Sequence, residues 1–179
     1  MFDTVEIKKA FETFGKEVIQ LSRSNLTRKG KNVSKELYNG MEYEFEGFKN
    51  GFTFIIRMPE YGLYQDEGVK GVNSSSKAPR SPYRFGSGTG KKGGLTQGID
   101  RWVRSRRFQF RKPNGQFMSY ESTSFLIRRS IWQTGIPASN FFKDAFEAKF
   151  KRLEPKIEDA MVLDVERFLG RIKKQIEKQ

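Results

Sequence analysis

The chain of 179 residues contains neither cysteine nor histidine. Without cysteine there are no disulfides and no thiolate nucleophiles, and without both residue types the usual zinc ligand sets and every histidine-based triad are excluded. Histidine is also the side chain that most often acts as a general base near neutral pH. An enzyme would have to rely on carboxylates, lysine, tyrosine or bound Mg²⁺. The sequence therefore predicts a protein that is not an enzyme and has no catalytic, cofactor or metal residues.

Long apolar runs are missing as well. The uncharged apolar runs cover only a few residues, whereas a membrane-spanning helix needs about 20. Asp3 and Glu6 are acids where a secretory signal peptide would carry bases. We therefore expect neither a membrane span nor a signal of this kind. A core is still available, and it is dominated by phenylalanine, with 17 Phe against 9 Leu.

The net charge of +13 is concentrated in one quarter of the chain. Residues 70–112 contain 12 Lys or Arg and a single acid, Asp100, so this segment carries +11. Such a concentration predicts an acidic or polyanionic partner. Tyr83 and Phe85 lie among the bases and could stack on nucleic acid bases or anchor in a protein groove, and we favour the protein. The candidate interaction residues are Lys70, Lys77, Arg80, Tyr83, Arg84, Phe85, Lys91, Lys92, Arg101, Arg104, Arg106 and Arg107.

Hydrophobic periodicity predicts an α+β fold. An apolar stripe with helical spacing predicts a long helix over residues 4–28. Two alternating runs on either side of Asn50-Gly51 predict an antiparallel hairpin whose aromatic face points to the core. Three glutamates occupy its other face and are interpreted as the solvent side of the sheet, with a metal site as the alternative. The helical stripe is Ile7, Phe11, Phe14, Val18 and Leu21, and the glutamates are Glu42, Glu44 and Glu46.

Residues 70–94 are expected to form an extended basic loop. This stretch contains six Gly, five Ser, six bases and no acid. Loops of this length inside a compact domain are uncommon and usually functional or disordered. Because the segment has little apolar surface of its own to bury, we expect it to be mobile in the isolated chain and ordered by a neighbouring subunit or a ligand.

The remaining chain predicts further helices. Residues 60–67 form two helical turns that Gly68 ends, and residues 95–107 form a basic helix with Ile99, Trp102 and Val103 inside. A second hairpin is expected over 108–119. A helix over 120–134 precedes Gly135, with Phe125, Ile127, Ile131 and Trp132 as its apolar residues. Pro155 marks a kink or restart, and residues 155–179 form a C-terminal helical extension with the stripe Ile157, Met161, Val165, Phe168, Ile172 and Ile176. We expect one domain, residues 1–179.

Two short motifs resemble catalytic or nucleotide-binding signatures. Residues 86–94 are similar to a phosphate-binding loop, but Phe85 stands at the position of its first glycine and Lys92 at that of its Ser or Thr, which favours a flexible basic loop. Glu147-Ala148-Lys149 matches a fragment of Mg²⁺-dependent nucleases. In those enzymes the fragment lies on a strand, whereas here it lies in a helix, where residues i and i+2 diverge.

The order of features resembles the head–tail joining and tail-completion proteins of tailed bacteriophages. Their pattern has a tyrosine with an acidic-Gly pair after a hairpin, a Pro-rich loop, and a late Pro-x-x-Phe segment ending in alanine. The resemblance covers residues 1–150, and the abundance of Lys and Phe is similar to neck-ring proteins of crAss-like phages of gut Bacteroidetes. The matching segments are Met58–Tyr61, Tyr64–Gly68, Ser81–Arg84 and Pro137–Ala145.

The resemblance implies a structural virion protein, assembled in the host cytoplasm, that forms an oligomeric ring in the phage neck. Its implied partners are copies of itself, the portal or adaptor protein and the tail proteins, around a channel through which DNA passes. Two alternatives stay open. One is a DNA-binding module that uses residues 70–112, and the weaker one is a carboxylate-based nuclease. Salt-dependent DNA binding and Mg²⁺-dependent cleavage would distinguish them.

Overall fold

The computed structural model describes residues 4–32, 34–48, 51–88 and 93–176. They form an α+β fold of helices with two small antiparallel sheets, which confirms the predicted class. The chain divides into two compact units. Unit 1 comprises Met1–Pro59 and Phe141–Gln179, and unit 2 comprises Glu60–Asn140. One domain is expected from the sequence, and within the chain residues 60–140 make most of their contacts among themselves.

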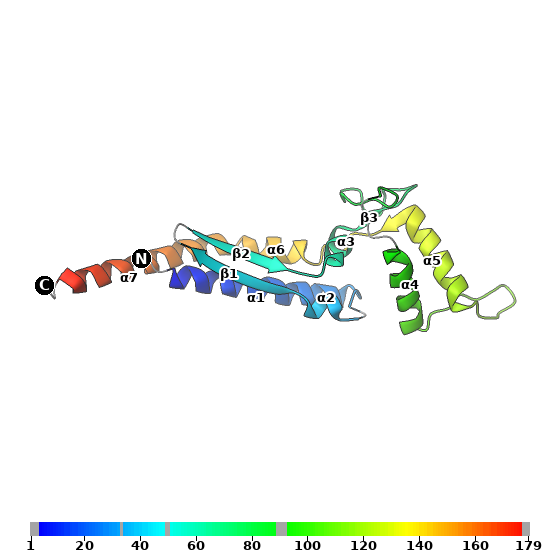
Figure 1. Ribbon diagram of the computed structural model, residues 1–179, viewed down its shortest axis with the longest axis horizontal. Coiled ribbons are helices and arrows are strands. Elements are labelled where there is room, and N and C mark those ends of the chain that lie inside the picture. The colour runs from blue at the N-terminus through cyan, green and yellow to red at the C-terminus, as the bar shows by residue number, and fades with distance from the viewer. Residues whose placement is uncertain (1–3, 33, 49–50, 89–92, 177–179) are drawn as a thin grey trace. The chain divides into compact units, whose positions relative to one another are not determined.

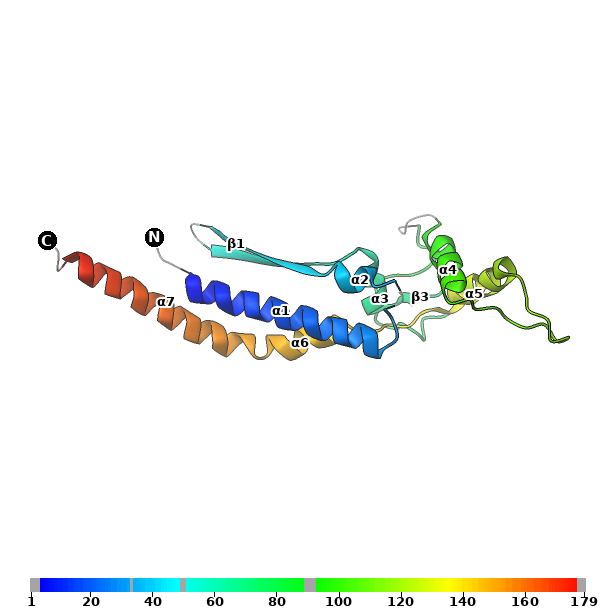
Figure 2. The ribbon, with the colours of Figure 1, turned by 90° about the horizontal axis from the view of Figure 1, so that it is seen from below.

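The long helix α1 (Val5–Arg28) is the centre of unit 1. It lies between a β-hairpin on one side and the helices α6 (Lys143–Phe150) and α7 (Leu153–Ile176) on the other, as Figure 2 shows. The predicted helix is thus confirmed, but it buries more than one stripe. The buried residues of α1 belong to two clusters that follow one another along the helix, and each cluster draws partners from both covered sides. They are Phe14 and Val18 with Leu153, and Ile19 and Leu26 with Leu37, Met41 and Phe141.

The hairpin of unit 1 pairs β1 (Glu42–Phe48) with β2 (Gly51–Arg57) in antiparallel register (Figure 1). Asn50 of the predicted turn lies outside the described residues. Aromatic side chains of the inner face contact α1, and the Phe54 ring lies 5.4 Å from that of Phe11 and 5.8 Å from that of Phe14. The three glutamates of β1 are exposed, and Arg57 donates to Glu44 at 2.6 Å. The predicted alternation of aromatic and acidic residues is therefore confirmed.

The chain leaves unit 1 after Pro59 and returns to it at Phe141, which is fully buried. The short helix α2 (Glu36–Asn39) contributes Leu37 to the same cluster. Asn25 in α1 donates from its side-chain nitrogen to the carbonyl of Phe141 at 3.0 Å, which ties the returning chain to α1. Pro155 lies in the first turn of α7, where a backbone N–H would have no partner within the helix, so the proline costs no hydrogen bond. The helix restart predicted at Pro155 is thus confirmed.

A buried carboxylate joins α7 to the beginning of α1. Asp164 of α7 has no exposed surface, and its oxygens accept from the backbone N–H groups of Glu6 and Ile7, each at 3.1 Å. These amides belong to the first turn of α1, whose N–H groups have no partner within the helix. The negative charge also suits the positive end of the helix dipole. Arg167 donates to Glu6 at 2.7 Å beside this site, and hydrogen bonds from Lys9 and Arg167 lower the pKa of Glu6.

The face that α7 presents to α1 differs from the predicted stripe. The buried residues of α7 are Leu153, Ala160 and Asp164, whereas Met161, Val165, Ile172 and Ile176 are exposed. The difference arises because Asp164 must face the α1 amides, which turns Met161, Val165 and Ile172 away from α1. Two members of the predicted stripe are half-buried: Ile157, which packs against the cluster of Phe14 and Val18, and Phe168. The first half of α7 is thus part of unit 1, and only its C-terminal part continues beyond the first residue of α1 (Figure 2).

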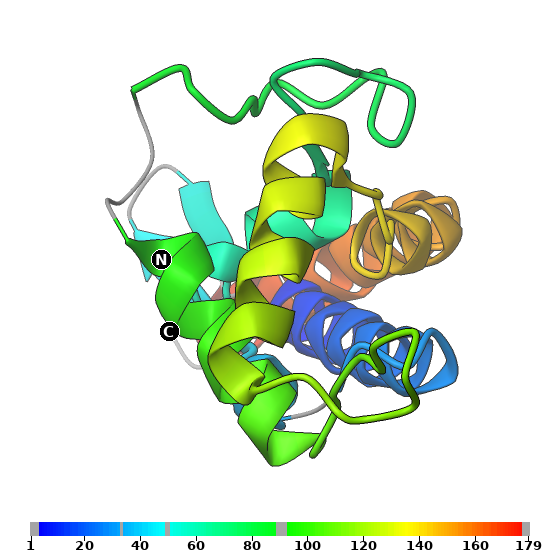
Figure 3. The ribbon, with the colours of Figure 1, turned by 90° about the vertical axis from the view of Figure 1, so that its right-hand side faces the viewer.

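Unit 2 is built on two helices that lie side by side, α4 (Gly94–Ser105) and α5 (Tyr120–Thr134) (Figure 3). Ser119 caps α5 by accepting from the N–H of Ser122 at 3.1 Å. The predicted helix is confirmed; its buried residues are Thr123 and Ser124, while the apolar residues Phe125 and Trp132 are exposed. The small side chain of Thr123 lets the backbone approach, and its hydroxyl accepts from the N–H of Phe110 at 3.3 Å.

The predicted hairpin over 108–119 is a turn with one bridge between Arg111 and Phe117, without strands. Its backbone closes through Lys112, whose N–H donates to Gln116 at 2.8 Å. On α4, Val103 is buried as expected, but Trp102 is exposed. The expected inner face of this helix is therefore only partly right.

The second sheet lies in unit 2 and pairs β3 (Val69–Lys70) with β4 (Gly135–Ile136), next to the helix α3 (Tyr61–Glu67). Glycine at two positions permits the close approach of the two backbones in this sheet. Gly68 ends α3 with φ 73°, and a Cβ there would lie 2.6 Å from the backbone nitrogen of Ala138. Gly135 follows α5 with φ 88°, and a Cβ there would collide with the carbonyl of Val69. Both glycines are predicted as helix ends, and the structure confirms this.

We expect Phe54→Ala to lower the free energy of unfolding by about 3 kcal/mol, the lower end of the usual range for this change, because the ring is only half-buried. Urea denaturation followed by circular dichroism measures the loss. Phe48→Ala is the matched control, because Phe48 belongs to the same hairpin and is exposed. A loss below about 1 kcal/mol for Phe54→Ala would place the core face elsewhere.

We expect Asp164→Ala to lower the free energy of unfolding by about 2–3 kcal/mol. The change removes the acceptor of two buried amides at a helix N-terminus. Asp159→Ala, on the exposed side of the same helix, serves as the control and should change it by less than about 0.5 kcal/mol. Equal effects of the two substitutions would contradict the capping role.

Candidate functional site

Unit 2 contains the predicted interaction residues. It carries 14 bases and five acids, whereas the rest of the chain carries 20 bases and 16 acids. Apart from Arg128 and Arg129 of α5, the bases that the structure describes fall into two groups with different surroundings. One group lies in residues 70–88 and the other in α4 and the turn that follows it. Lys91 and Lys92 lie outside the described residues.

Residues 70–88 do not form the extended arm expected from the sequence, because their backbone is bonded to the rest of unit 2. The N–H of Lys70 donates to Tyr83 and that of Phe85 to Lys70, each at 2.9 Å. The N–H groups of Val72 and Asn73 donate to the carbonyls of Trp132 and Gln133 at the end of α5. Figure 3 shows this segment beside that end of α5. Backbone hydrogen bonds thus order a segment whose composition offers little apolar burial.

Several bases of this first group are used within unit 2. Arg84 donates to the carbonyls of Gly71 and Val72 at 3.3 and 3.2 Å and to the hydroxyl of Ser75 at 3.0 Å. Lys77 donates to Thr134 at 2.7 Å. Arg80 is exposed. Arg84 and Lys77 therefore hold the turns of this segment in place, and a partner is not needed to explain them.

The two aromatic residues of this segment also pack within unit 2. The Tyr83 ring meets that of Tyr64 edge-on at 4.6 Å, and the Phe85 ring lies 5.5 Å from that of Trp132. Burial raises the pKa of Tyr83, and the nearby Glu67 and Tyr64 raise it further. Tyr83 is therefore neutral at physiological pH. The side chains of Tyr83 and Phe85 are half-buried, which leaves part of each ring accessible.

The second group of bases lies on an exposed surface rich in aromatic rings. Arg104 pairs with Glu121 at 3.2 Å and lies over the Tyr120 ring. Arg101, Arg106 and Arg107 are exposed and have no acidic partner among the described residues. We call this the basic aromatic surface, and its members are Arg101, Trp102, Arg104, Arg106, Arg107, Phe108, Phe110, Arg111 and Phe117.

Ring contacts connect the members of the basic aromatic surface. Trp102 lies 5.8 Å from Phe108, which meets Phe110 edge-on at 5.2 Å. The Arg111 guanidinium lies 4.6 Å from the centre of the Phe117 ring. The sequence did not reveal this surface, because the alternation of Phe108 and Phe110 is typical of a buried strand face. Exposed apolar patches beside charged residues are typical of interaction sites.

A groove of about 500 Å³ lies where this surface meets α5. Apolar side chains line most of it, and Arg111 and Ser130 add polar groups. Its lining comes from the turn after α4 and from one side of α5. The residues are Phe110, Arg111, Met118, Leu126, Ile127, Ser130 and Ile131.

Segments that carry the resemblance to phage proteins meet in unit 2. Ser81 donates to the carbonyl of Gly68 at 2.7 Å. The N–H groups of Ser139 and Asn140 donate to the carbonyl of Asp66 at 3.0 and 2.8 Å. These hydrogen bonds fix how three parts of unit 2 join.

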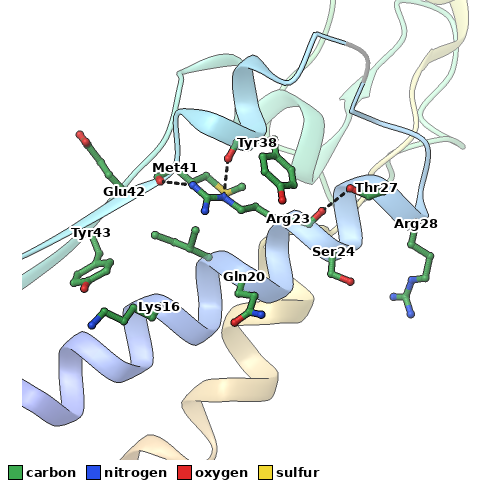
Figure 4. Close-up of a pocket in the computed structure, with 11 residues that line it drawn as sticks. Lys16, Gln20, Arg23, Ser24, Thr27, Arg28, Tyr38, Met41, Glu42 and Tyr43 are labelled. Atoms are coloured by element: carbon green, nitrogen blue, oxygen red, sulfur yellow. Dashed lines mark hydrogen bonds between the residues drawn. The ribbon is translucent and has the colours of Figure 1, made fainter.

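Unit 1 has a larger groove of about 1200 Å³ between α1, α2 and the start of β1 (Figure 4). Arg23 is the charged side chain at its centre. It donates to the carbonyls of Tyr38 and Met41 at 2.8 and 3.4 Å and lies over the Tyr38 ring. Arg23 is thus committed to holding α2 against α1.

Within the described residues, no three acidic side chains come close enough to hold a metal ion together, and no helix is both long and apolar enough to cross a membrane. Comparison with protein-family models, with curated proteins and with solved structures found no match.

We expect the amides of Lys70, Val72, Asn73 and Phe85 to be protected from hydrogen exchange in the isolated chain, because each donates to a backbone carbonyl within unit 2. Amide exchange followed by NMR or by mass spectrometry measures this. The exposed Gly86–Gly88 segment provides the internal comparison and should exchange faster. Fast exchange at all of these positions would restore the mobile arm that the composition predicts.

Proposed function

We propose that the chain is a structural subunit of a tailed-phage virion, assembled in the host cytoplasm into a ring in the neck that joins the portal or adaptor of the head to the tail around the DNA channel. The observation that carries this proposal is the basic aromatic surface. Its rings and arginines remain exposed in the isolated chain, and aromatic and arginine side chains dominate protein interfaces.

Two further features support a role in assembly rather than catalysis. The chain lacks histidine, the most frequent general acid or base, and cysteine, the thiolate nucleophile. The pattern shared with head–tail joining proteins falls on residues that hold unit 2 together, such as Gly68 and Ser81, which is what a shared architecture would require. The proposed partners are copies of the chain, the portal or adaptor and the tail proteins.

A second candidate function is non-specific DNA binding by the same surface. The specific observation in its favour is that Arg101, Arg106 and Arg107 are exposed without acidic partners among the described residues. In that case the affinity for duplex DNA would fall with salt, and the log–log slope would be about −0.9 for each phosphate contacted. Protein contact accounts better for the aromatic rings, because sequence-independent binding of duplex DNA depends on charge alone.

The test replaces the chain in infected cells by an Arg101→Glu, Arg106→Glu variant. We expect heads without tails in electron micrographs, because the subunit no longer joins the neck. A Lys31→Glu, Lys151→Glu variant makes the same change in charge on exposed residues of unit 1 and should give normal particles. Normal particles from the first variant, combined with lost DNA binding, would favour the second function. Absence of the chain from purified virions by mass spectrometry would refute the neck role.

A further inference from the structure

The outer side of α7 is an apolar stripe that unit 1 leaves uncovered. Its members recur at spacings of 3, 4, 3 and 4, so they lie along one side of the helix. All are exposed, although helices of globular proteins normally bury such a stripe. The stripe continues past the contact between Arg167 and Glu6, where α7 extends beyond α1 (Figure 2). Its residues are Val162, Val165, Leu169, Ile172 and Ile176.

The last part of this stripe lies on a stretch of helix that unit 1 leaves open to solvent. Every residue from Leu169 to Ile176 is exposed, and Gly170 is a weak helix former in its middle. Helices in proteins owe most of their stability to the packing of an apolar face. This part of α7 is therefore stabilised when a second surface covers the stripe.

Charge is divided along α7. Between Leu153 and Glu166 the helix has five acids and one base, whereas between Arg167 and Ile176 it has four bases and no acid. Glu166 and Lys173 are both exposed and have no ion-pair partner among the described residues. Each directly follows a residue of the stripe, and such positions form the charged pairs between the helices of a coiled coil. The stripe is therefore bordered by an acid in one half of α7 and by a base in the other.

We propose that the stripes of two copies of the chain pair with each other, with the two α7 helices antiparallel. This arrangement points the basic end of each α7 toward the acidic half of the other. A parallel pair would instead set like charges side by side along the whole contact, which is unfavourable. The division of charge along α7 thus makes the stripe complementary to itself in one direction only.

Charge also selects the register of the pair. With Leu169 opposite Ile172 of the second copy and Val165 opposite Ile176, the Glu166 carboxylate of each copy lies beside Lys173 of the other. A shift that sets Val165 opposite Leu169 would bring the two Glu166 side chains together. In the favoured register residues 165–176 of the two helices overlap over about 18 Å. Because this interface is small, we expect a weak dimer that forms at high concentration.

The pair is a contact of the free chain and goes beyond the proposed function. Both copies contribute the same surface, so the contact is isologous and closes at two copies. A ring of many subunits needs a heterologous contact instead. The inference therefore stands or falls independently of the neck role.

Sedimentation velocity on the full chain measures the dimer. Leu169→Asp should weaken self-association at least about tenfold, because it places a charge on each side of an apolar contact. Leu163→Asp is the matched control, since Leu163 is 50% exposed against 57% for Leu169 but lies off the stripe, and it should leave association unchanged. Circular dichroism verifies that both variants are folded.

A second set of variants changes only exposed charges and remains informative if an aspartate variant does not fold. Glu166→Lys and Lys173→Glu should each weaken association about fivefold, because each replaces two attractive contacts by repulsive ones. Both changes in one chain should restore association, as should mixing the two single variants. Lys174→Glu makes the same change of charge away from the stripe and should have no effect.

Disulfide cross-linking determines the direction of the helices, because the chain has no cysteine of its own. Val165→Cys chains mixed with Ile176→Cys chains should cross-link after oxidation, since these positions face each other in the antiparallel pair. Val165→Cys chains alone should not, because their cysteines lie about 16 Å apart along the helices. In a parallel pair the Val165→Cys chains would cross-link with one another.

Three results would overturn the antiparallel pair. One is a wild-type chain that stays monomeric at about 1 mM. Another is association that survives Leu169→Asp, and the third is cross-linking of Val165→Cys chains with one another but not with Ile176→Cys chains. None of these results bears on whether the chain is present in virions, so failure of the pair is distinguishable from failure of the neck role.

Discussion

Unit 1 depends on a carboxylate that the last helix supplies to the first turn of α1. Asp164 is fully buried, and an unpaired buried charge would be strongly destabilising, so α7 must keep its register and rotation relative to α1. That requirement selects Leu153 and Ala160 as the neighbours of α1. It also turns the later apolar residues of α7 outward. A polar constraint at one end of the helix pair thus determines which apolar surface the protein exposes.

The basic residues of unit 2 illustrate how charge is divided between internal and external roles. Arg84 and Lys77 satisfy carbonyls and hydroxyls of the turns that follow β3 and lie within a structural network. Arg101 and Arg106 have no such role and leave their charge to solvent. A high net charge therefore does not measure the strength of an interaction surface. The number of bases without internal partners is the relevant quantity, and in unit 2 these lie next to exposed aromatic rings.

Sequence patterns predicted the local elements well and the buried faces less well. The periods of α1 and of the hairpin, and the positive φ of Gly68 and Gly135, follow from local spacing and backbone sterics. The buried faces of α5 and α7 depend on single polar contacts over long separations, of Thr123 with Phe110 and of Asp164 with Ile7. Hydropathy alone would bury Phe125 in α5 and Met161 in α7, both of which are exposed. The order of residues 70–88 was unpredictable because it comes from backbone hydrogen bonds, which composition does not reveal.

The return of the chain at Phe141 also bears on how the protein is made. Unit 2 is one continuous stretch, Glu60–Asn140, whereas unit 1 needs contacts between residues 116 and 158 positions apart, from Asn25 to Phe141 and from Glu6 to Asp164. Synthesis from the N-terminus therefore completes the inserted unit first, and domains generally fold as units while they emerge. Leu26 can meet Leu37 and Met41 before then, but it lacks Phe141, and Val18 lacks Leu153, until the end of the chain leaves the ribosome. Over that interval the side of α1 that α6 and α7 cover stays exposed, and transiently exposed apolar surface of this kind is what chaperones protect.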